Sequence, residues 1–99
     1  MNFHDQCYKL LLKVPKGKVT TYQAIAHALK TKAYRAVGTA MAKNPNPISV
    51  PCHRVVKSSG EIGNYAFGID KKIALLEQEG IEIKNGKVVN FADVLYDFL

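Results

Sequence analysis

The residues best suited to covalent chemistry are Cys52 and its neighbour His53, which stand between a proline and an arginine. Cysteine attacks as the thiolate, so a nearby base is what activates it. Adjacent side chains point to opposite faces of a strand, so His53 can reach Cys52 directly only in a turn or at a helix start, and otherwise through a water. A carboxylate behind the imidazole would fix its tautomer, and Glu77 and Glu79 are the candidates. The competing interpretation is a buried structural cysteine beside a surface histidine.

The remaining cysteine and histidines do not indicate a metal centre. Two cysteines in the whole chain exclude a disulfide framework and a cysteine-rich zinc module. Cys7, His4 and His27 have no finger-like spacing to Cys52 and His53, so we expect no metal site. We interpret Cys7 as a core residue of the first helix and the two other histidines as surface residues.

Positive charge is concentrated in the first sixty residues. Of the 99 residues 14 are Lys or Arg and 8 are Asp or Glu, for a net charge of +6. Residues 1–60 hold ten of these cations and a single acid, Asp5, for a net +9, whereas residues 61–99 hold four cations and seven acids, for a net −3. Such a surface attracts a phosphate backbone, so nucleic acid is the favoured partner and a solvated lysine-rich face is the alternative.

The size and hydropathy of the chain predict one small domain over residues 1–99. No apolar run approaches the roughly 20 residues that span a bilayer, and the first residues lack the pattern of a signal peptide. We therefore expect no membrane association and a cytoplasmic protein, or a nuclear one in a eukaryote.

Helical periodicity and turn signals predict a helix-turn-helix ahead of the Cys52–His53 pair. Thr20 and Thr21 are N-cap candidates for its first helix, and Gly38 and several alanines would let its second helix approach another backbone closely, such as a phosphodiester chain. An Asn-Gly hairpin near the end of the chain completes a mainly α fold with a small β-hairpin. The predicted elements are an amphipathic helix over 3–14, helices ending at Leu29 and Lys43, a helix over 69–78 that buries Ile73, Leu75 and Leu76, the hairpin over 82–89, and a short helix over 91–99.

A set of motifs in fixed order resembles the DNA-binding and active-site domain of the O6-alkylguanine-DNA alkyltransferases over about residues 3–80. The resemblance implies a winged-helix-like helix-turn-helix domain. It also implies transfer of an alkyl group from guanine O6 in DNA to a cysteine of the protein, once per molecule and without a cofactor. The motifs are Arg35-Ala36-Val37-Gly38, Asn44-Pro45, Pro51-Cys52-His53-Arg54-Val55-Val56, Ser59-Gly60 and Gly63-Asn64-Tyr65.

The resemblance implies a role for each matching catalytic position. Cys52 matches the alkyl acceptor, His53 the residue that activates it through a water, and Glu79, rather than Glu77, the carboxylate that orients the histidine. Asn44 matches the side chain that braces the turn carrying the cysteine.

The resemblance also implies how DNA is bound. Arg35 matches the side chain that fills the stack when the nucleotide is flipped out, and Tyr22 matches the tyrosine that helps to rotate it. The chain is expected to bind double-stranded DNA in the minor groove as a monomer. The further substrate-binding residues implied are Val55, Tyr65 and Ala66, and the DNA-binding residues are Gln23, Tyr34, Ala36, Gly38, Lys43 and Ser58.

Three departures from the family pattern leave alternatives. The chain begins directly at the DNA-binding domain, and Ala66-Phe67 stands where many relatives have Ser-Gly. The short length and the hairpin also resemble the alkyltransferase-like proteins, which flip alkylated guanine without repairing it; those typically have Trp where Cys52 stands, so the cysteine favours transfer. A helix-turn-helix transcription regulator is a third interpretation, disfavoured because the small residues of the second helix offer few side chains to read bases.

Overall fold

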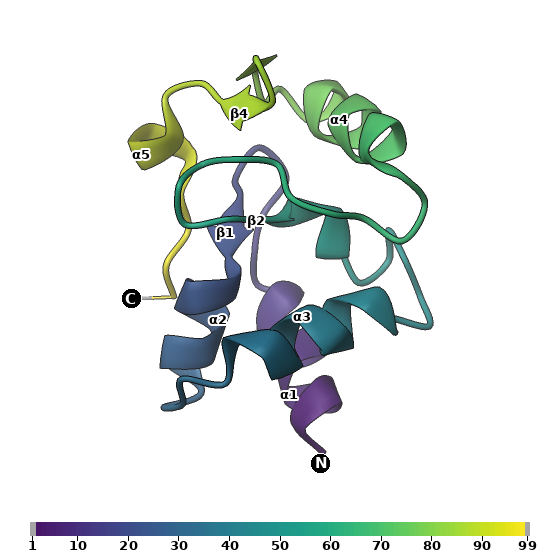
Figure 1. Cartoon of the computed structure of the whole chain (residues 1–99), viewed down its shortest axis with the longest axis vertical. Helices are drawn as coiled ribbons and strands as arrows, with labels where there is room; N and C mark the ends of the chain where they lie inside the picture. Colours follow the sequence, from purple (N-terminus) through teal and green to yellow (C-terminus); the bar gives the residue numbers. More distant parts are fainter. Residues whose placement is uncertain (1, 99) are drawn as a thin grey trace.

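The computed structural model describes residues 2–98 and has short elements gathered around one central pair of strands. In Figure 1 the first three helices lie below this pair, and α4, the hairpin and α5 lie above it. The mainly helical fold with a small sheet is the predicted class. The elements are α1 (Phe3–Leu11), β1 (Thr20–Thr21), α2 (Tyr22–Ala28), α3 (Tyr34–Ala42), the 3₁₀ turn η1 (Cys52–Arg54), β2 (Val55–Val56), α4 (Ile69–Gln78), β3 (Ile83–Lys84), β4 (Lys87–Val88) and α5 (Phe91–Val94).

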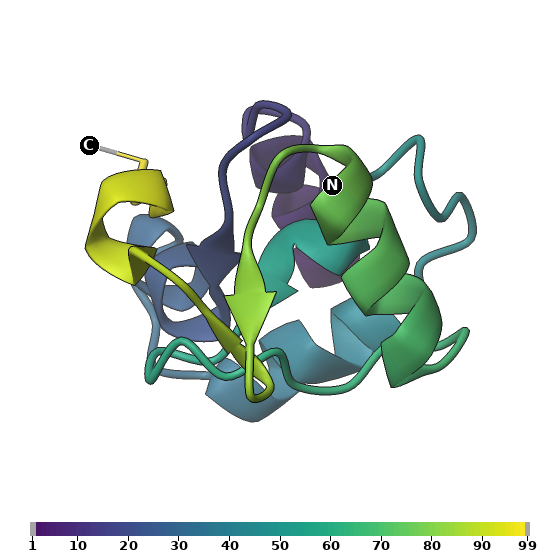
Figure 2. The same cartoon turned by 90° about the horizontal axis from the view of Figure 1, so that it is seen from above.

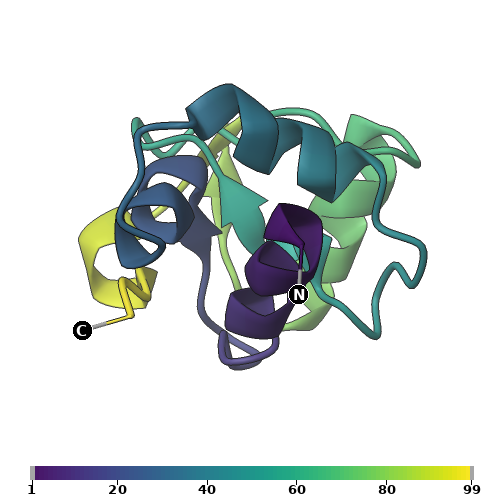
Figure 3. The same cartoon turned by 90° about the horizontal axis from the view of Figure 1, so that it is seen from below.

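The helix-turn-helix is present as predicted. Thr21 is the N-cap of α2, and its side-chain oxygen accepts a hydrogen bond from the Ala24 N–H at 2.9 Å. The Tyr8 hydroxyl donates to the Ala40 carbonyl at 2.8 Å and so fastens α1 to α3. Seen from below (Figure 3), α2 and α3 lie side by side with α1 packed against them. The first helix ends at Leu11, earlier than predicted, although Val14 is still buried.

Strand β2 joins two hydrophobic clusters. Its alternating side chains place Val55 in the cluster of α1, α2 and α3, and Val56 in the cluster of α4 and the hairpin. Cys7 and Cys52 belong to the first cluster, as does Met41 of α3. The chain segment that follows Cys52 is therefore fixed from both sides.

The structure confirms the predicted hairpin, and it also contains a pair of parallel strands that was not predicted. Asn85 and Gly86 form the turn between β3 and β4 with positive φ angles of 55° and 76°, the backbone that an Asn-Gly turn favours. The sequence did not predict that β1 pairs in parallel with β2, with Thr20 opposite Val55 and Thr21 opposite Val56. Two-residue strands are too short to show a periodic pattern, and their pairing is a long-range contact.

The predicted helix over 91–99 is wrong in length. Helix α5 ends at Val94, and the chain continues extended alongside Val19. The Val19 N–H donates to the Val94 carbonyl at 2.9 Å, and the Tyr96 N–H donates to the Val19 carbonyl at 2.7 Å. These bonds satisfy the open edge beside β1, which a longer helix would leave unpaired. Seen from above (Figure 2), the hairpin runs between α4 and α5; Leu99 lies outside the described residues.

A buried lysine joins α4 to the centre of the fold. Lys72 is fully buried, and its ammonium donates to the carbonyls of Val55 at 2.6 Å and Asn64 at 3.0 Å. Within residues 2–98 no carboxylate forms an ion pair with it. Burial lowers the pKa of Lys72 to about 8. On the same helix Leu76 is buried as predicted, while Ile73 and Leu75 are only half-buried.

The substitution Lys72→Met tests the buried ammonium through the pH dependence of stability. Between a pKa of about 8 in the fold and 10.5 unfolded, the unfolded chain binds more protons, so rising pH favours the folded state. From pH 7 to about 9.5 the wild type should gain about 2 kcal/mol in free energy of unfolding relative to Lys72→Met. Urea unfolding followed by circular dichroism measures this. The exposed Lys71→Met is the control and should keep the wild-type pH dependence; parallel curves for wild type and Lys72→Met would contradict the assignment.

Candidate active site

Cys52 begins the 3₁₀ turn η1, directly before β2. The Cys52 N–H donates to the Val50 carbonyl at 2.7 Å, and the Arg54 N–H donates to the Pro51 carbonyl at 3.0 Å. Cys52 is 5% exposed and His53 is 1% exposed. The pair therefore occupies a helical turn rather than an extended strand, in which the two side chains would point to opposite faces.

His53 is hydrogen-bonded to Glu79, at the end of α4. The distance from Nε2 to the Glu79 Oε2 atom is 3.0 Å, whereas the buried Nδ1 atom has no partner within residues 2–98. Burial lowers the pKa of His53, against the opposing effect of Glu79, so the ring is neutral at neutral pH. A carboxylate only accepts, so the proton of the neutral ring belongs on Nε2. Nδ1 is then left with a lone pair that can accept a proton.

Arg54 holds the same carboxylate from its other side. Its Nε and Nη2 atoms donate to Oε1 and Oε2 of Glu79 at 2.8 and 2.7 Å, and its Nη1 donates to the Val14 carbonyl at 2.8 Å. Burial acts to raise the pKa of Glu79, but the hydrogen bonds from Arg54 and His53 outweigh it and hold the pKa below its ordinary value. Glu79 is therefore ionised, and its orientation is fixed by a bidentate pair.

Asn44 braces the loop that leads to the cysteine. Its side-chain amide donates to the Val50 carbonyl at 2.8 Å, and its side-chain oxygen accepts from the Asn46 N–H at 2.9 Å. The same Val50 carbonyl accepts from the Cys52 N–H. One carbonyl therefore connects Asn44 to the backbone of the cysteine.

Cys52 opens into a small cavity, which we call the cysteine pocket. Its volume is about 180 Å³, below the roughly 300–1,000 Å³ of sites for drug-sized ligands, so any group that it holds must be small. The Tyr65 hydroxyl is buried without a partner in the described part of the chain. Burial raises the pKa of Tyr22 and of Tyr65, so both hydroxyls remain protonated donors. The pocket is lined by Tyr22, Gly38, Met41, Ala42, Cys52, Asn64, Tyr65 and Ala66.

Two of the predicted substrate-binding residues lie outside this lining. Val55 is fully buried, and its carbonyl accepts from Lys72. Arg35 lies instead in an adjoining open groove beside α3, which we call the helix groove. The helix groove is lined by Tyr22, Tyr34, Arg35, Gly38, Thr39, Ala42, Lys57, Gly63 and Asn64.

The predicted DNA-binding residues divide into three groups. Tyr34 and Gly38 line the helix groove, and the exposed His27 is within hydrogen-bond distance of the Tyr34 hydroxyl, at 3.0 Å. Gln23 and Ser58 line a neighbouring groove together with Tyr22, Tyr34, Lys57 and Ser59. Ala36 and Lys43 line neither groove; Ala36 is half-buried and Lys43 is exposed at the end of α3.

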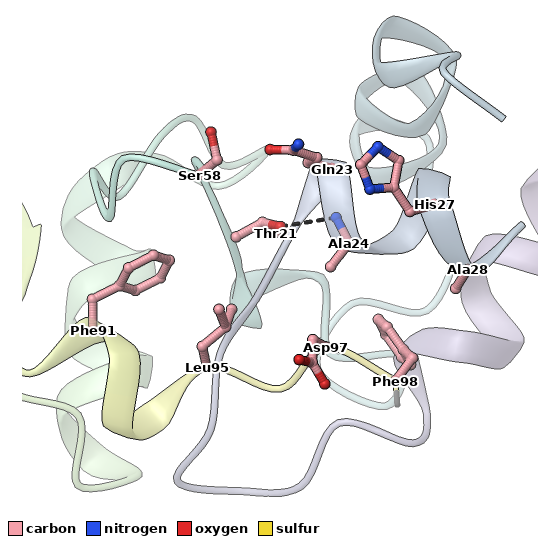
Figure 4. Close-up of a pocket in the computed structure, with 10 residues that line it drawn as sticks. All are labelled: Thr21, Gln23, Ala24, His27, Ala28, Ser58, Phe91, Leu95, Asp97 and Phe98. Atoms are coloured by element: carbon pink, nitrogen blue, oxygen red, sulfur yellow. Dashed lines mark hydrogen bonds between the residues drawn. The ribbon is translucent and has the colours of Figure 1, made fainter. Parts of the chain in front are cut away.

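The hollow between α2 and the C-terminal segment is larger but has no cysteine among its described lining residues. It has a volume of about 420 Å³ (Figure 4), and its walls include His27 of α2 and Leu95 and Phe98 of the C-terminal segment. Gln23 and Ser58 stand at its border with the groove described above. Of these two cavities, the smaller cysteine pocket is the one whose described lining includes a thiol.

Other site types find no support in residues 2–98. No group of three or more His, Cys, Asp or Glu side chains is placed to hold a metal ion. No described helix is long and apolar enough to cross a membrane.

Sequence reasoning missed two residues of the site. Arg54 stands inside the Pro-Cys-His-Arg motif, and its position next to His53 was the available signal for a second contact with the carboxylate. Lys72 had no such signal, because a lysine in an amphipathic helix usually faces solvent. Of the two candidate carboxylates, Glu79 contacts His53 and Glu77 is exposed.

The comparisons with known proteins agree with one another. The family model described as 6-O-methylguanine DNA methyltransferase, DNA binding domain, matches residues 2–81. A methylated-DNA–protein-cysteine methyltransferase of Saccharolobus solfataricus is 48% identical over 81 residues, which are 82% of this chain and 52% of that protein. The chain thus spans about half the length of this relative.

Two solved structures are similar in backbone as well. Mycobacterium tuberculosis OGT in complex with DNA has a TM-score of 0.77 and 44% identity, covering 80% of this chain and 50% of that one. S. pombe Atl1 in complex with damaged DNA containing O6-carboxymethylguanine has a TM-score of 0.83 and 31% identity, covering 95% and 94% of the two chains. With a family model matched over most of its length, the chain belongs to the 6-O-methylguanine DNA methyltransferase family through its DNA-binding domain.

Proposed function

We propose that the protein repairs DNA by transferring an alkyl group, such as methyl, from O6 of guanine to Cys52. The observation that carries this function is a cysteine in a small pocket beside a neutral histidine with an unpartnered Nδ1. The names of the relatives support it, since the Saccharolobus protein is a methylated-DNA–protein-cysteine methyltransferase and the OGT structure contains DNA.

The reaction is a displacement at the alkyl carbon. A water passes the Cys52 proton to Nδ1 of His53, and the Glu79 carboxylate stabilises the resulting imidazolium. The thiolate sulfur forms a bond to the alkyl carbon while the bond from that carbon to guanine O6 breaks, and the electron pair stays on the base. The guanine base takes up the proton held by the His53 imidazolium, so neutral guanine remains in the DNA and His53 returns to its neutral form. The thioether persists, so each molecule acts once.

Entry of the base requires extrusion from the duplex. Chemistry on a paired base needs the nucleotide to leave the stack, at a cost of a few kcal/mol. In this proposal Arg35, at the start of α3, occupies the vacated space, and Tyr22, shared by the helix groove and the cysteine pocket, guides the nucleotide inward. The small residues of α3 permit close approach to the minor groove.

A second candidate function is recognition of alkylated guanine without transfer. It is favoured by the match to Atl1, which extends over nearly the whole of both chains. In this alternative the pocket holds the flipped base and Cys52 remains unmodified.

Mass spectrometry separates the two functions. Incubation with duplex DNA containing O6-methylguanine should convert the wild-type protein to a species heavier by one methyl group in place of hydrogen, located on the Cys52 peptide. Cys52→Ser should show no adduct while still binding the DNA, and Cys7→Ser should react like wild type. An unmodified wild type that binds the lesion tightly would establish recognition without transfer.

Arg35→Ala tests the extrusion step. An arginine that fills the stack matters only where stacking and pairing must be lost, so this change should slow transfer from duplex DNA by at least tenfold more than transfer from the same single strand, equivalent to about 1.4 kcal/mol or more. Single-turnover rates on both substrates measure the difference. Lys43→Ala, at the C-terminal end of the same helix, serves as a charge control. If Arg35→Ala lowers the transfer rate by the same factor on both substrates, Arg35 is only a general phosphate contact.

A further inference from the structure

We propose that the Lys57 ammonium binds a phosphate of the nucleotide whose base occupies the cysteine pocket. This inference rests on the proposed function and adds a positioning residue to it. Lys57 follows β2 directly and is exposed. It lines the helix groove and also the neighbouring groove that contains Gln23 and Ser58.

The small volume of the cysteine pocket and the residues that it shares with the helix groove put the phosphate of the bound nucleotide near Lys57. The cysteine pocket has about 180 Å³, below the range of sites for drug-sized ligands, so we assign it to the base alone, with the sugar and phosphates outside. The pocket shares Tyr22, Gly38 and Asn64 with the helix groove, so a nucleotide with its base inside must leave its backbone in that groove. Lys57 forms part of the wall of this groove.

Lys57 is the cation in that wall that remains free for a phosphate. Among the described lining residues of the helix groove, Arg35 and Lys57 carry positive charge and none carries negative charge. The extrusion step assigns Arg35 to the base stack. Within residues 2–98 no carboxylate forms an ion pair with Lys57. A phosphate is therefore the natural partner of its ammonium.

Two hydrogen bonds hold the backbone of Lys57 in place. The Lys57 N–H donates to the Glu61 carbonyl at 2.9 Å, and its carbonyl accepts from the Gly60 N–H at 2.9 Å. The side-chain stem passes close to Gly63: its Cγ lies 3.6 Å from the point where a Cβ at residue 63 would stand. A position fixed by two backbone bonds suits a contact that must orient one nucleotide rather than attract DNA in general.

The experiment combines Lys57→Gln with removal of single phosphate charges. Duplex DNA carries O6-methylguanine with natural phosphates, or with a neutral methylphosphonate on either the 5′ or the 3′ side of the lesion. Single-turnover transfer is measured on all three with Cys52 intact. Equilibrium binding by fluorescence anisotropy is measured on all three with Cys52→Ser added to each protein, because transfer would otherwise consume the lesion. Lys71→Gln, an exposed change of the same charge on α4 outside both grooves, is the matched control.

Lys57→Gln should weaken binding of natural lesion DNA by roughly three- to tenfold and lower the slope of log affinity against log salt by about one, while Lys71→Gln leaves both unchanged. One of the two methylphosphonates should abolish the difference between wild type and Lys57→Gln. The proposal is overturned if Lys57→Gln binds like the Lys71→Gln control. It is also overturned if Lys57→Gln binds more weakly than wild type on each of the two methylphosphonate duplexes.

Failure of the proposed function gives a different result. If the wild type binds lesion DNA but forms no methyl adduct, transfer is wrong, while the anisotropy comparison still tests Lys57. If the wild type neither prefers lesion DNA to undamaged DNA nor forms a methyl adduct, no base enters the pocket and both proposals fall.

Discussion

The carboxylate of Glu79 is the interaction on which the site depends. It accepts from His53 with one oxygen and from Arg54 with both, at 2.7 to 3.0 Å. Arg54 also reaches the Val14 carbonyl beyond the end of α1, so this cluster joins the first helix, the cysteine turn and the end of α4. A buried carboxylate is costly unless it is paired, and here two donors keep it ionised. Its charge in turn fixes which histidine nitrogen remains free.

The strand after the cysteine gives this cluster a rigid support. Val55 and Val56 point into two different hydrophobic clusters, and β2 pairs with β1 directly before α2. Lys72 connects β2 to the segment around Asn64 that walls the cysteine pocket. One small sheet therefore anchors three parts of the site: Cys52, the first helix of the helix-turn-helix and the pocket wall. In the proposed reaction, a base that enters between α3 and this segment would meet the Cys52 sulfur in a fixed position.

Short sequence patterns predicted the features that depend on neighbouring residues alone, such as helix caps and turns. The Thr21 cap, the two helices of the helix-turn-helix and the Asn85-Gly86 turn follow from capping, periodicity and turn chemistry. The structure confirms them, with both helices ending one residue earlier than predicted. The parallel pairing of β1 with β2 and the extended segment after Val94 are long-range contacts between very short segments, which carry no periodic signal. The burial of Lys72 was equally hidden, because two backbone carbonyls distant in sequence satisfy its ammonium. The pairing of Glu79 with His53 was anticipated, whereas the contribution of Arg54 was not.

Determining the tautomer of His53 by NMR is the most direct test of its proposed role as the base that activates Cys52. Nitrogen chemical shifts of protein labelled with ¹⁵N at histidine, assigned with a His53→Gln variant, distinguish a protonated from an unprotonated ring nitrogen. The hydrogen bond to Glu79 predicts that at neutral pH Nε2 is protonated and Nδ1 is not. A proton on Nδ1, or on both nitrogens, would contradict the assignment of His53 as the base that activates Cys52.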